Sequence, residues 1–220
     1  MKSYLIKVLS SYVGSFVLVA FALGASGSAN ASEAMLKRFF NEVSNLQADF
    51  EQIIVDEKGN TVEKKSGVFS FSRPGKFRWN YMADEPDYPL GQQIISDGSL
   101  ITFYDPDFET ATQRSMVNAL EQVPTLVLVQ SGASLERHFS ITDIGETDGR
   151  SWVNLKPKDE NTSYRGLMVG FTKQSLSAIV FIDGLGNETR LTFDAVRTNT
   201  KLQADLFSFT AGPNVDVIRQ

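Results

Sequence analysis

The sequence predicts an α+β protein that is mainly β, with about eleven strands in a mostly antiparallel sheet. Apolar and polar residues alternate in short runs along much of the 220-residue chain, which is typical of strands with one dry face. Turn-forming residues separate these runs, and short connections favour antiparallel pairing. Helical spacing of apolar residues is confined to a few segments. A sheet with this many strands is expected to curl strongly.

The first 31 residues are expected to be a secretory signal peptide. Two lysines among the first seven residues precede an apolar core over residues 12–23, and the Ala-Asn-Ala triplet ending at Ala31 matches a cleavage pattern. The alternative is a transmembrane anchor, but a span needs about 20 apolar residues and this core is shorter. Residues 32–220 are expected to form one domain. Because the chain has no cysteine, we expect export to a bacterial periplasm rather than a eukaryotic secretory route.

The amphipathic pattern after this triplet predicts a helix over residues 33–45, with Ser32 as its N-cap. Its apolar stripe consists of Leu36, Phe39, Phe40 and Val43. The spacing changes to alternation at Leu46, which predicts a strand over residues 47–56. The strands predicted to follow cover residues 62–72, 77–81, 94–95 and 100–104, the last two joined as a hairpin by S-D-G-S.

The middle of the chain is predicted to leave the sheet. Residues 112–123 carry Met116, Ala119, Leu120 and Val123 at helical spacing. The apolar run over residues 125–131 fits either a short buried helix or a strand, because periodicity alone cannot separate the two. Pro124 suits the first position of a helix, and a departure from the meander favours the helix. The C-terminal third returns to strands, predicted near residues 137–143, 151–156, 164–172, 176–183, 188–197 and 206–210.

Aromatic residues gather on one face of the predicted sheet. Alternation places Phe69 and Phe71 on one side of a strand. Phe77, Trp79 and Tyr81 share a side of the next strand. Two interpretations stay open. These rings fill an ordinary core, or they line the concave wall of a cavity that amphipathic helices cover.

Arg73 lies at the end of the Phe69/Phe71 face and precedes a proline. An unpaired buried guanidinium is costly, and its five donors suit the free carbonyl groups at a helix C-terminus. One interpretation is therefore a latch between the helices and the sheet. The other is a solvated arginine at the rim.

This chain lacks the residues that several kinds of catalytic and metal-binding site require. It has no cysteine and one histidine, His138, which excludes thiol nucleophiles, Cys-ligated zinc and paired-histidine metal motifs. Neither a G-x-S-x-G nor an S-x-x-K nucleophile motif is present. The formal net charge of −5 argues against nucleic-acid binding. Residues 105–109 lack calcium-loop spacing, and the glycines at 184 and 186 lack a dinucleotide fingerprint. We therefore expect no enzymatic activity, no metal and no cofactor.

Four segments occur in an order that resembles a known family. They are G-V-F-S-F-S-R-P-G-K-F-R-W over residues 67–79, I-S-D-G over 95–98, F-Y-D-P over 103–106 and P-T-L-V-L over 124–128. Together with the amphipathic helix before them, they are similar to the LolA family of periplasmic outer-membrane lipoprotein carrier proteins. The resemblance extends over essentially all of residues 32–220.

The resemblance implies an unclosed antiparallel β-barrel with a lid of two or three helices over a hydrophobic cavity. It implies binding of the acyl chains of lipoproteins. An inner-membrane ATP-binding-cassette release complex would supply the lipoprotein, and an outer-membrane receptor lipoprotein would accept it. A monomer is the default expectation. The lid latch is expected at Arg73, Phe40, Leu128 and Val129. With the face pattern added, the ligand- and partner-binding surface is expected at Phe69, Phe71, Phe77, Trp79, Tyr81 and Phe103.

Two departures from the family pattern concern the cavity. Residues 88–93 look longer than usual before S-D-G, so we expect a different cavity mouth. Ile101 and Thr102 replace a large aromatic residue before F-Y, so we expect a looser wall.

Two alternative functions stay open from the residues. A periplasmic lipid-sensing regulator or envelope binding module of similar fold would bind a protein partner stably. A hydrolase would need a carboxylate pair, for which Asp84, Glu85 and Asp87 are the candidates, although a solvated loop explains them better.

Overall fold

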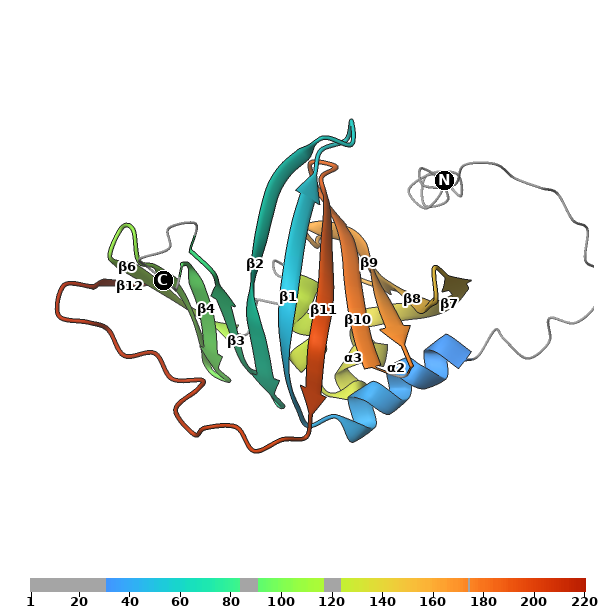
Figure 1. Cartoon of the computed structure of the whole chain (residues 1–220), viewed down its shortest axis with the longest axis horizontal. Helices are drawn as coiled ribbons and strands as arrows, with labels where there is room; N and C mark the ends of the chain where they lie inside the picture. The colour runs from blue at the N-terminus through green and yellow to red at the C-terminus, as the bar shows by residue number, and fades with distance from the viewer. Residues whose placement is uncertain (1–30, 84–90, 117–123, 174) are drawn as a thin grey trace, which may run out of the picture.

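The computed structural model describes residues 31–83, 91–116, 124–173 and 175–220, which form one curved sheet with helical segments packed against it (Figure 1). The sheet has twelve strands in the order β12-β6-β5-β4-β3-β2-β1-β11-β10-β9-β8-β7 and does not close into a barrel. The strands are β1 (Asn45–Val55), β2 (Thr61–Ser72), β3 (Lys76–Tyr81), β4 (Gln93–Asp97), β5 (Leu100–Asp105), β6 (Thr110–Ser115), β7 (Phe139–Thr147), β8 (Arg150–Pro157), β9 (Tyr164–Thr172), β10 (Ser175–Asp183), β11 (Glu188–Thr198) and β12 (Asp216–Arg219). The helical segments are α2 (Ala31–Glu42), the 3-10 helix η2 (Pro124–Val129) and α3 (Gly132–His138).

Antiparallel pairing of sequence neighbours builds most of the sheet. β1 pairs with both β2 and β11, so the central strand joins the two halves of the chain. β12 pairs with β6 in parallel, because the segment after β11 crosses to the far edge of the sheet first (Figure 1). Asp97 accepts the backbone N–H groups of Ser99 and Leu100 at 2.7 and 2.9 Å. This aspartate turn explains why S-D-G-S predicts the β4–β5 hairpin.

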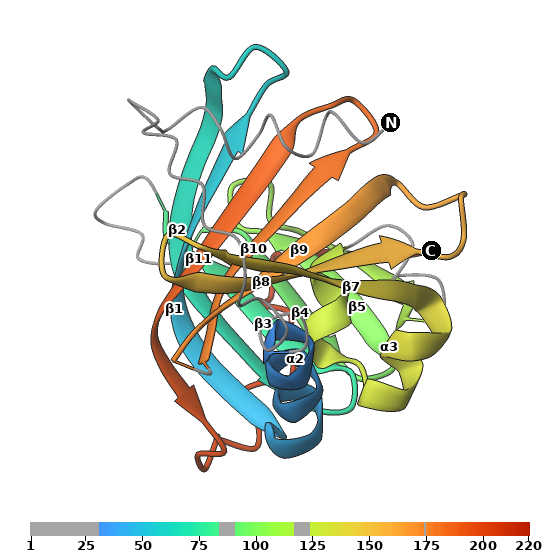
Figure 2. The same ribbon diagram turned by 90° about the vertical axis from the view of Figure 1, so that its right-hand side faces the viewer.

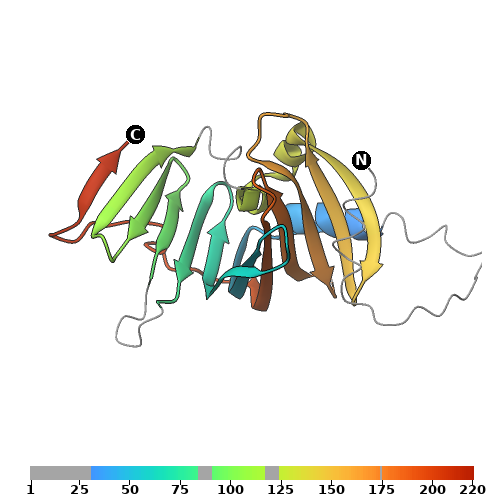
Figure 3. The same cartoon turned by 90° about the horizontal axis from the view of Figure 1, so that it is seen from above.

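The sheet curls around a concave face, and the helical segments cover part of that face (Figures 2 and 3). α2 contacts β7, β8, β9 and α3. Its predicted apolar stripe faces inward, since Leu36, Phe39 and Phe40 are buried. All six residues of η2 are buried as well. Tertiary burial of apolar side chains, rather than helical propensity, stabilises helices this short.

The opposite, convex face of β3 to β6 is covered by the C-terminal segment after β11. Phe207 of this segment is buried, and Arg78 of β3 donates to the Leu206 carbonyl oxygen at 3.1 Å. The rings of Tyr104 and Phe209 lie 5.4 Å apart. The chain therefore provides its own cover on each side of the sheet.

The mainly β, unclosed architecture predicted from the sequence is confirmed, with twelve strands instead of about eleven. Residues 125–131 take the helical alternative, because 124–129 form η2. α2 ends at Glu42, before the predicted residue 45, because β1 already begins at Asn45. Ser32 is not an N-cap, since α2 already includes Ala31.

Three predicted elements are wrong. Residues 112–115 belong to β6 rather than to a helix, because they pair with β5. Residues 206–210 do not form a strand; the Leu206 N–H bonds to the Gln203 carbonyl oxygen at 3.3 Å in a turn, and the last strand is β12. Residues 137 and 138 end α3 instead of starting a strand. Gly132, a common helix terminator, conceals this helix in the sequence.

Some predictions fall outside the described residues. They concern the signal peptide up to residue 30, the acidic segment 84–87, the first half of the lengthened segment 88–93 and the helical pattern over 117–123. Within the described ranges, none of the helices combines the length and the hydropathy that crossing a membrane requires.

Candidate functional site

Arg73 lies directly after β2 and joins the sheet to two helical segments. Its backbone N–H donates to the Ser44 carbonyl oxygen at 2.8 Å, which fixes it beside the α2–β1 connection. The guanidinium Nη1 donates to the carbonyl oxygens of Val43 and, at 3.2 Å, of Phe39. Nη2 donates to the Leu128 carbonyl oxygen of η2 at 2.8 Å. One cation therefore binds carbonyl groups at the C-terminal ends of both α2 and η2.

Aromatic rings enclose this guanidinium. Its central carbon lies 4.8 Å from the ring centroids of Phe39 and Phe40 and 4.7 Å from that of Phe71, within reach of cation–π attraction. Burial lowers the pKa of Arg73 to about 10, and its Nε is buried without a hydrogen-bond partner. Among the described residues, no carboxylate forms an ion pair with this cation. Carbonyl dipoles and rings hold the charge, so its lost solvation is only partly compensated.

The aromatic residues of β2 and β3 form the interior beneath the helical segments. Phe69 and Trp79 stack with ring centroids 4.0 Å apart, and Phe71 meets Phe39 of α2 at 6.1 Å. Phe77 is equally buried. Such ring pairs contribute about 0.5–1.5 kcal/mol beyond their buried area. The rings that the sequence places on one face therefore meet, and they pack on one another while the helices cover them.

The three other residues expected at the lid, Phe40, Leu128 and Val129, are buried against this interior. Val129 accepts the Gly75 N–H through its carbonyl oxygen at 3.1 Å. Gly75 has a φ of 74°, a left-handed conformation that favours glycine. Together with Arg73, it lets the β2–β3 turn bind two consecutive carbonyl groups of η2.

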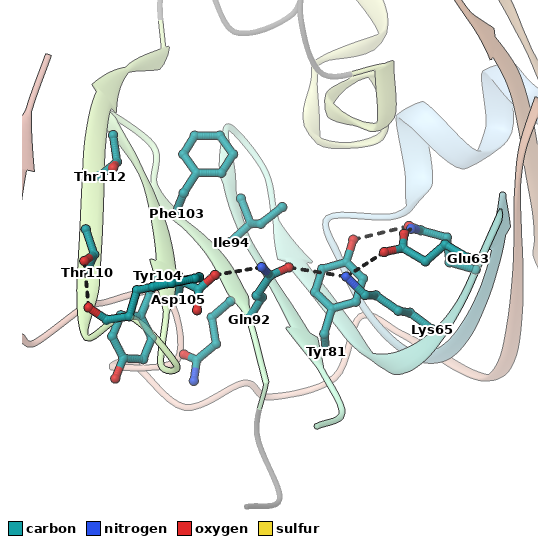
Figure 4. Close-up of a pocket in the computed structure, with 13 residues that line it drawn as sticks. Glu63, Lys65, Tyr81, Gln92, Ile94, Phe103, Tyr104, Asp105, Thr110 and Thr112 are labelled. Atoms are coloured by element: carbon teal, nitrogen blue, oxygen red, sulfur yellow. Dashed lines mark hydrogen bonds and ion pairs between the residues drawn. The ribbon is translucent and has the colours of Figure 1, made fainter. Parts of the chain in front are cut away.

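An open pocket of about 610 Å³ lies on the part of the concave face that the helices leave free (Figure 4). Tyr81, Ile94 and Phe103 form its apolar wall, from β3, β4 and β5. Register explains this grouping, because Ile94 lies between Trp79 and Phe103 on neighbouring strands. The volume lies within the range of about 300–1,000 Å³ that is typical of ligand pockets.

A row of polar side chains borders this pocket (Figure 4). Lys65 of β2 forms an ion pair with Glu63 at 2.9 Å and donates to Gln92 Oε1 at 3.4 Å. Gln92 Nε2 donates to Asp105 Oδ2 of β5 at 2.8 Å. We call these four residues the polar rim. No motif marks the polar rim in the sequence, because only the folding of the sheet brings its members together.

Tyr81 connects the apolar wall with the polar residues. Its ring lies 5.3 Å from that of Phe50, and its hydroxyl donates to Gln52 Oε1 at 3.2 Å. Burial, with a smaller contribution from the Glu63 carboxylate, raises the pKa of Tyr81 to about 12. The hydroxyl therefore stays protonated near neutral pH.

A smaller pocket of about 210 Å³ lies between α2 and α3. Phe40, Leu135 and Ile141 supply its apolar side, and Lys37 and Glu136 supply its polar side. Space therefore remains directly beside the lid residue Phe40.

The structure divides the residues expected to bind ligand into two groups. Buried beneath the helical segments are Phe69, Phe71, Phe77 and Trp79. Bordering the open pocket are Tyr81 and Phe103. Beneath the helices the expected cavity is therefore filled by packed rings, and open space lies beside the helices instead.

In the described parts of the chain, no three His, Cys, Asp or Glu side chains gather in a metal-binding cluster. Asp105 closes a turn, because its Oδ1 accepts the Asp107 N–H at 3.1 Å. His138 is exposed at the end of α3.

Known proteins with similar sequences identify the family. The family model described as outer membrane lipoprotein carrier protein LolA matches residues 41–210. An outer-membrane lipoprotein carrier protein of Methylococcus capsulatus is 36% identical over 193 residues, which cover 88% of this chain and 90% of the relative. One of Bordetella avium is 31% identical over 219 residues, with 100% of both chains covered.

A solved structure shows a similar fold. An uncharacterized conserved protein of Thermus thermophilus has a TM-score of 0.53 at 11% identity, with 86% of this chain and 99% of that chain covered. At this identity the likeness concerns the fold alone. The family itself rests on the sequence matches, which confirm the resemblance seen in the four motifs: this chain belongs to the outer membrane lipoprotein carrier protein LolA family.

Proposed function

We propose that this protein is a periplasmic carrier that binds the acyl chains of lipoproteins and delivers them to the outer membrane. Membership of the LolA family supports this role. The observation that carries the proposal is Arg73, whose guanidinium holds α2 and η2 over an interior of aromatic rings. The signal peptide over residues 1–31 would provide the route to the periplasm, and residues 32–220 would form the carrier domain.

Lid opening is the step that makes room for the cargo. A chain of about 15 methylenes gains about 12 kcal/mol on burial, at about 0.8 kcal/mol per methylene. Three chains would gain about 36 kcal/mol, well above the ceiling of roughly 18–21 kcal/mol for real complexes. Exposure of Phe39, Phe40 and Leu128, which are buried with the lid closed, offsets part of this gain. Closing the lid again favours release, so delivery needs no ATP.

The open pocket is the preformed part of the proposed binding surface. Ile94 and Phe103 offer contacts for a hydrocarbon chain. Lys65 and Gln92 of the polar rim lie beside them, with donors suited to the ester and amide groups that join acyl chains to a lipoprotein.

The proposed partners follow from this path. An inner-membrane ATP-binding-cassette release complex loads the carrier, and an outer-membrane receptor lipoprotein unloads it. The carrier acts as a monomer and catalyses no reaction. The absence of cysteine and the single histidine of the sequence support a binding role.

The test is release of radiolabelled lipoprotein from spheroplasts by the exported protein. We expect lipoprotein in the supernatant as a complex with the carrier. Phe103→Lys puts a charge on the pocket wall and should release much less. Leu185→Lys is the matched control, because Leu185 is 80% exposed on a distant hairpin and its change should have no effect. Release no greater than with buffer would overturn the proposal.

A further inference from the structure

The first turn of α2 meets an aspartate of the edge strand β7. The backbone nitrogen of Ser32 lies 3.0 Å from Asp143 Oδ2. Ser32 is only 2% exposed. α2 also contacts β7 and β8 more widely along its length, so this contact belongs to a packed interface.

The Asp143 carboxylate is oriented by its own strand. Its other oxygen, Oδ1, accepts the Gly145 N–H at 2.8 Å. The register between β7 and β8 shifts between Asp143 and Gly145, and Gly145 has a φ of 87°. Such a bulge re-aims a side chain. Within the described residues the carboxylate has no cationic partner, so one oxygen is fixed and the other faces Ser32.

The expected cleavage pattern ends at Ala31, so the bond to be broken is the one that holds the Ser32 nitrogen. We propose that cleavage after Ala31 converts this nitrogen into an α-ammonium group that forms an ion pair with Asp143 and fastens the start of α2 to β7. In this hydrolysis, water adds across the C–N bond. Ala31 leaves as a carboxylate, and the Ser32 nitrogen becomes protonated.

The Asp143 carboxylate offsets the positive charge at the start of α2. The N-terminus of a helix carries a partial positive charge, so an ammonium group there is unfavourable unless a carboxylate compensates it. Before cleavage, the neutral Ser32 N–H donates an ordinary bond to Asp143. After cleavage the contact is charged on both sides and stronger.

Both ends of α2 are then held to the sheet. Asp143 holds the first turn, and Arg73 holds the last turn through the Phe39 and Val43 carbonyl groups. Release of Arg73 alone would let α2 swing about its first turn. This inference rests on the signal peptide and not on the proposed cargo, so it can hold even if lipoprotein release fails.

The experiment begins with the full-length precursor exported from cells. The mass of the processed chain should place its first residue at Ser32. Asp143→Asn is then measured in two backgrounds: the native precursor, and one with Gly-Ser inserted after Ala31, in which the Ser32 nitrogen remains an amide. Urea unfolding at low salt gives the ratio of folded to unfolded protein. Asp143→Asn should lower this ratio in both backgrounds, and the reduction should be about tenfold larger in the native background than in the inserted one.

A second readout does not require the aspartate variants to fold. Between low salt and 1 M salt, the protein with a free Ser32 amine should lose more stability than the inserted protein, because salt screens the ion pair. An N-terminus at another residue would overturn the proposal. Equal effects of Asp143→Asn in the two backgrounds, or equal salt dependence, would do the same.

Discussion

Arg73, directly after β2, and Arg78, within β3, hold covers on opposite faces of the sheet. Arg73 donates to carbonyl groups of α2 and η2 on the concave face. Arg78 donates to the Leu206 carbonyl oxygen of the C-terminal segment on the convex face. The two side chains use the same chemistry, but their surroundings differ.

Arg78 has several partners besides its cover. It donates to Asn80 Oδ1 at 2.8 Å and to Gln93 Oε1 at 2.6 Å. Burial lowers its pKa, while the Asp205 carboxylate acts in the opposite direction. Arg73 has no such polar side-chain partners among the described residues, and its Nε is unpaired. The concave cover thus depends strongly on one buried cation, whereas the convex cover is also secured by pairing of β12 with β6.

From this difference we expect the cover on the concave face to be the one that moves. Packing and a few hydrogen bonds, those of Arg73 among them, hold the concave cover. We expect it to be released more easily than a cover that strand pairing holds. The concave face also carries the aromatic interior and the larger pocket, whereas on the convex face the C-terminal segment buries Phe207. The proposed movable lid therefore lies where the apolar surface for cargo is largest.

The largest effect is expected for Phe69→Ala beneath the concave cover. Phe69 is fully buried and stacked on Trp79, and removing a buried phenylalanine ring costs about 3–5 kcal/mol of unfolding free energy. Urea denaturation measures this loss. Phe108→Ala is the control, because Phe108 is 78% exposed and its removal should change stability by less than about 0.5 kcal/mol. Similar losses for both would show that the interior is not packed as described.

A smaller but functional effect is expected for Arg73→Leu. The variant loses the hydrogen bonds to the Phe39, Val43 and Leu128 carbonyl groups, and it also loses the cost of burying the charge. We expect a net change of about 1.5 kcal/mol, which shifts the lid equilibrium about tenfold toward the open state. The variant should still take up lipoprotein, while transfer to the acceptor should fall about tenfold. Arg78→Leu is the matched control and should change transfer less than about twofold. Normal transfer by Arg73→Leu would refute the latch.

The smallest effect concerns alkaline pH and the open pocket. Because the pKa of Tyr81 is raised to about 12, the stability from its neutral phenol is fully present below about pH 10. This stability is lost as the pH rises from about 10 to about 12. Tyr81→Phe should therefore show a shallower decline of unfolding free energy across this window. An unchanged slope would show that Tyr81 is not buried in solution.

Much of the fold could be predicted because strand alternation is a local signal. The Phe69/Phe71 face and the S-D-G-S hairpin are local in this sense, and the structure contains both. β12 could not be predicted, because its pairing with β6 joins distant segments in parallel. β6 resembled the start of a helix, since apolar residues further along extend a helical spacing from Thr112.

In the candidate site, too, local features could be predicted from the sequence and long-range contacts could not. The position of Arg73 after alternating phenylalanines leaves a latch to helix C-terminal carbonyl groups and a solvated rim arginine as equal alternatives. The identity of those groups, at Phe39, Val43 and Leu128, depends on tertiary packing. The polar rim depends on how β2, β5 and the residue before β4 come together in the sheet, which no local pattern in the sequence specifies.

The most direct test of the account is the distance between α2 and the sheet, with and without cargo. The chain has no cysteine, so spin labels at Lys37→Cys on α2 and Lys64→Cys on β2, both exposed in the structure, would be the only thiol labels. Pulsed electron paramagnetic resonance should give one distance for the empty protein and a longer one with a triacylated lipopeptide bound. Arg73→Leu should show the longer distance without cargo. An unchanged distance at saturating lipopeptide would contradict a lid that opens to admit acyl chains.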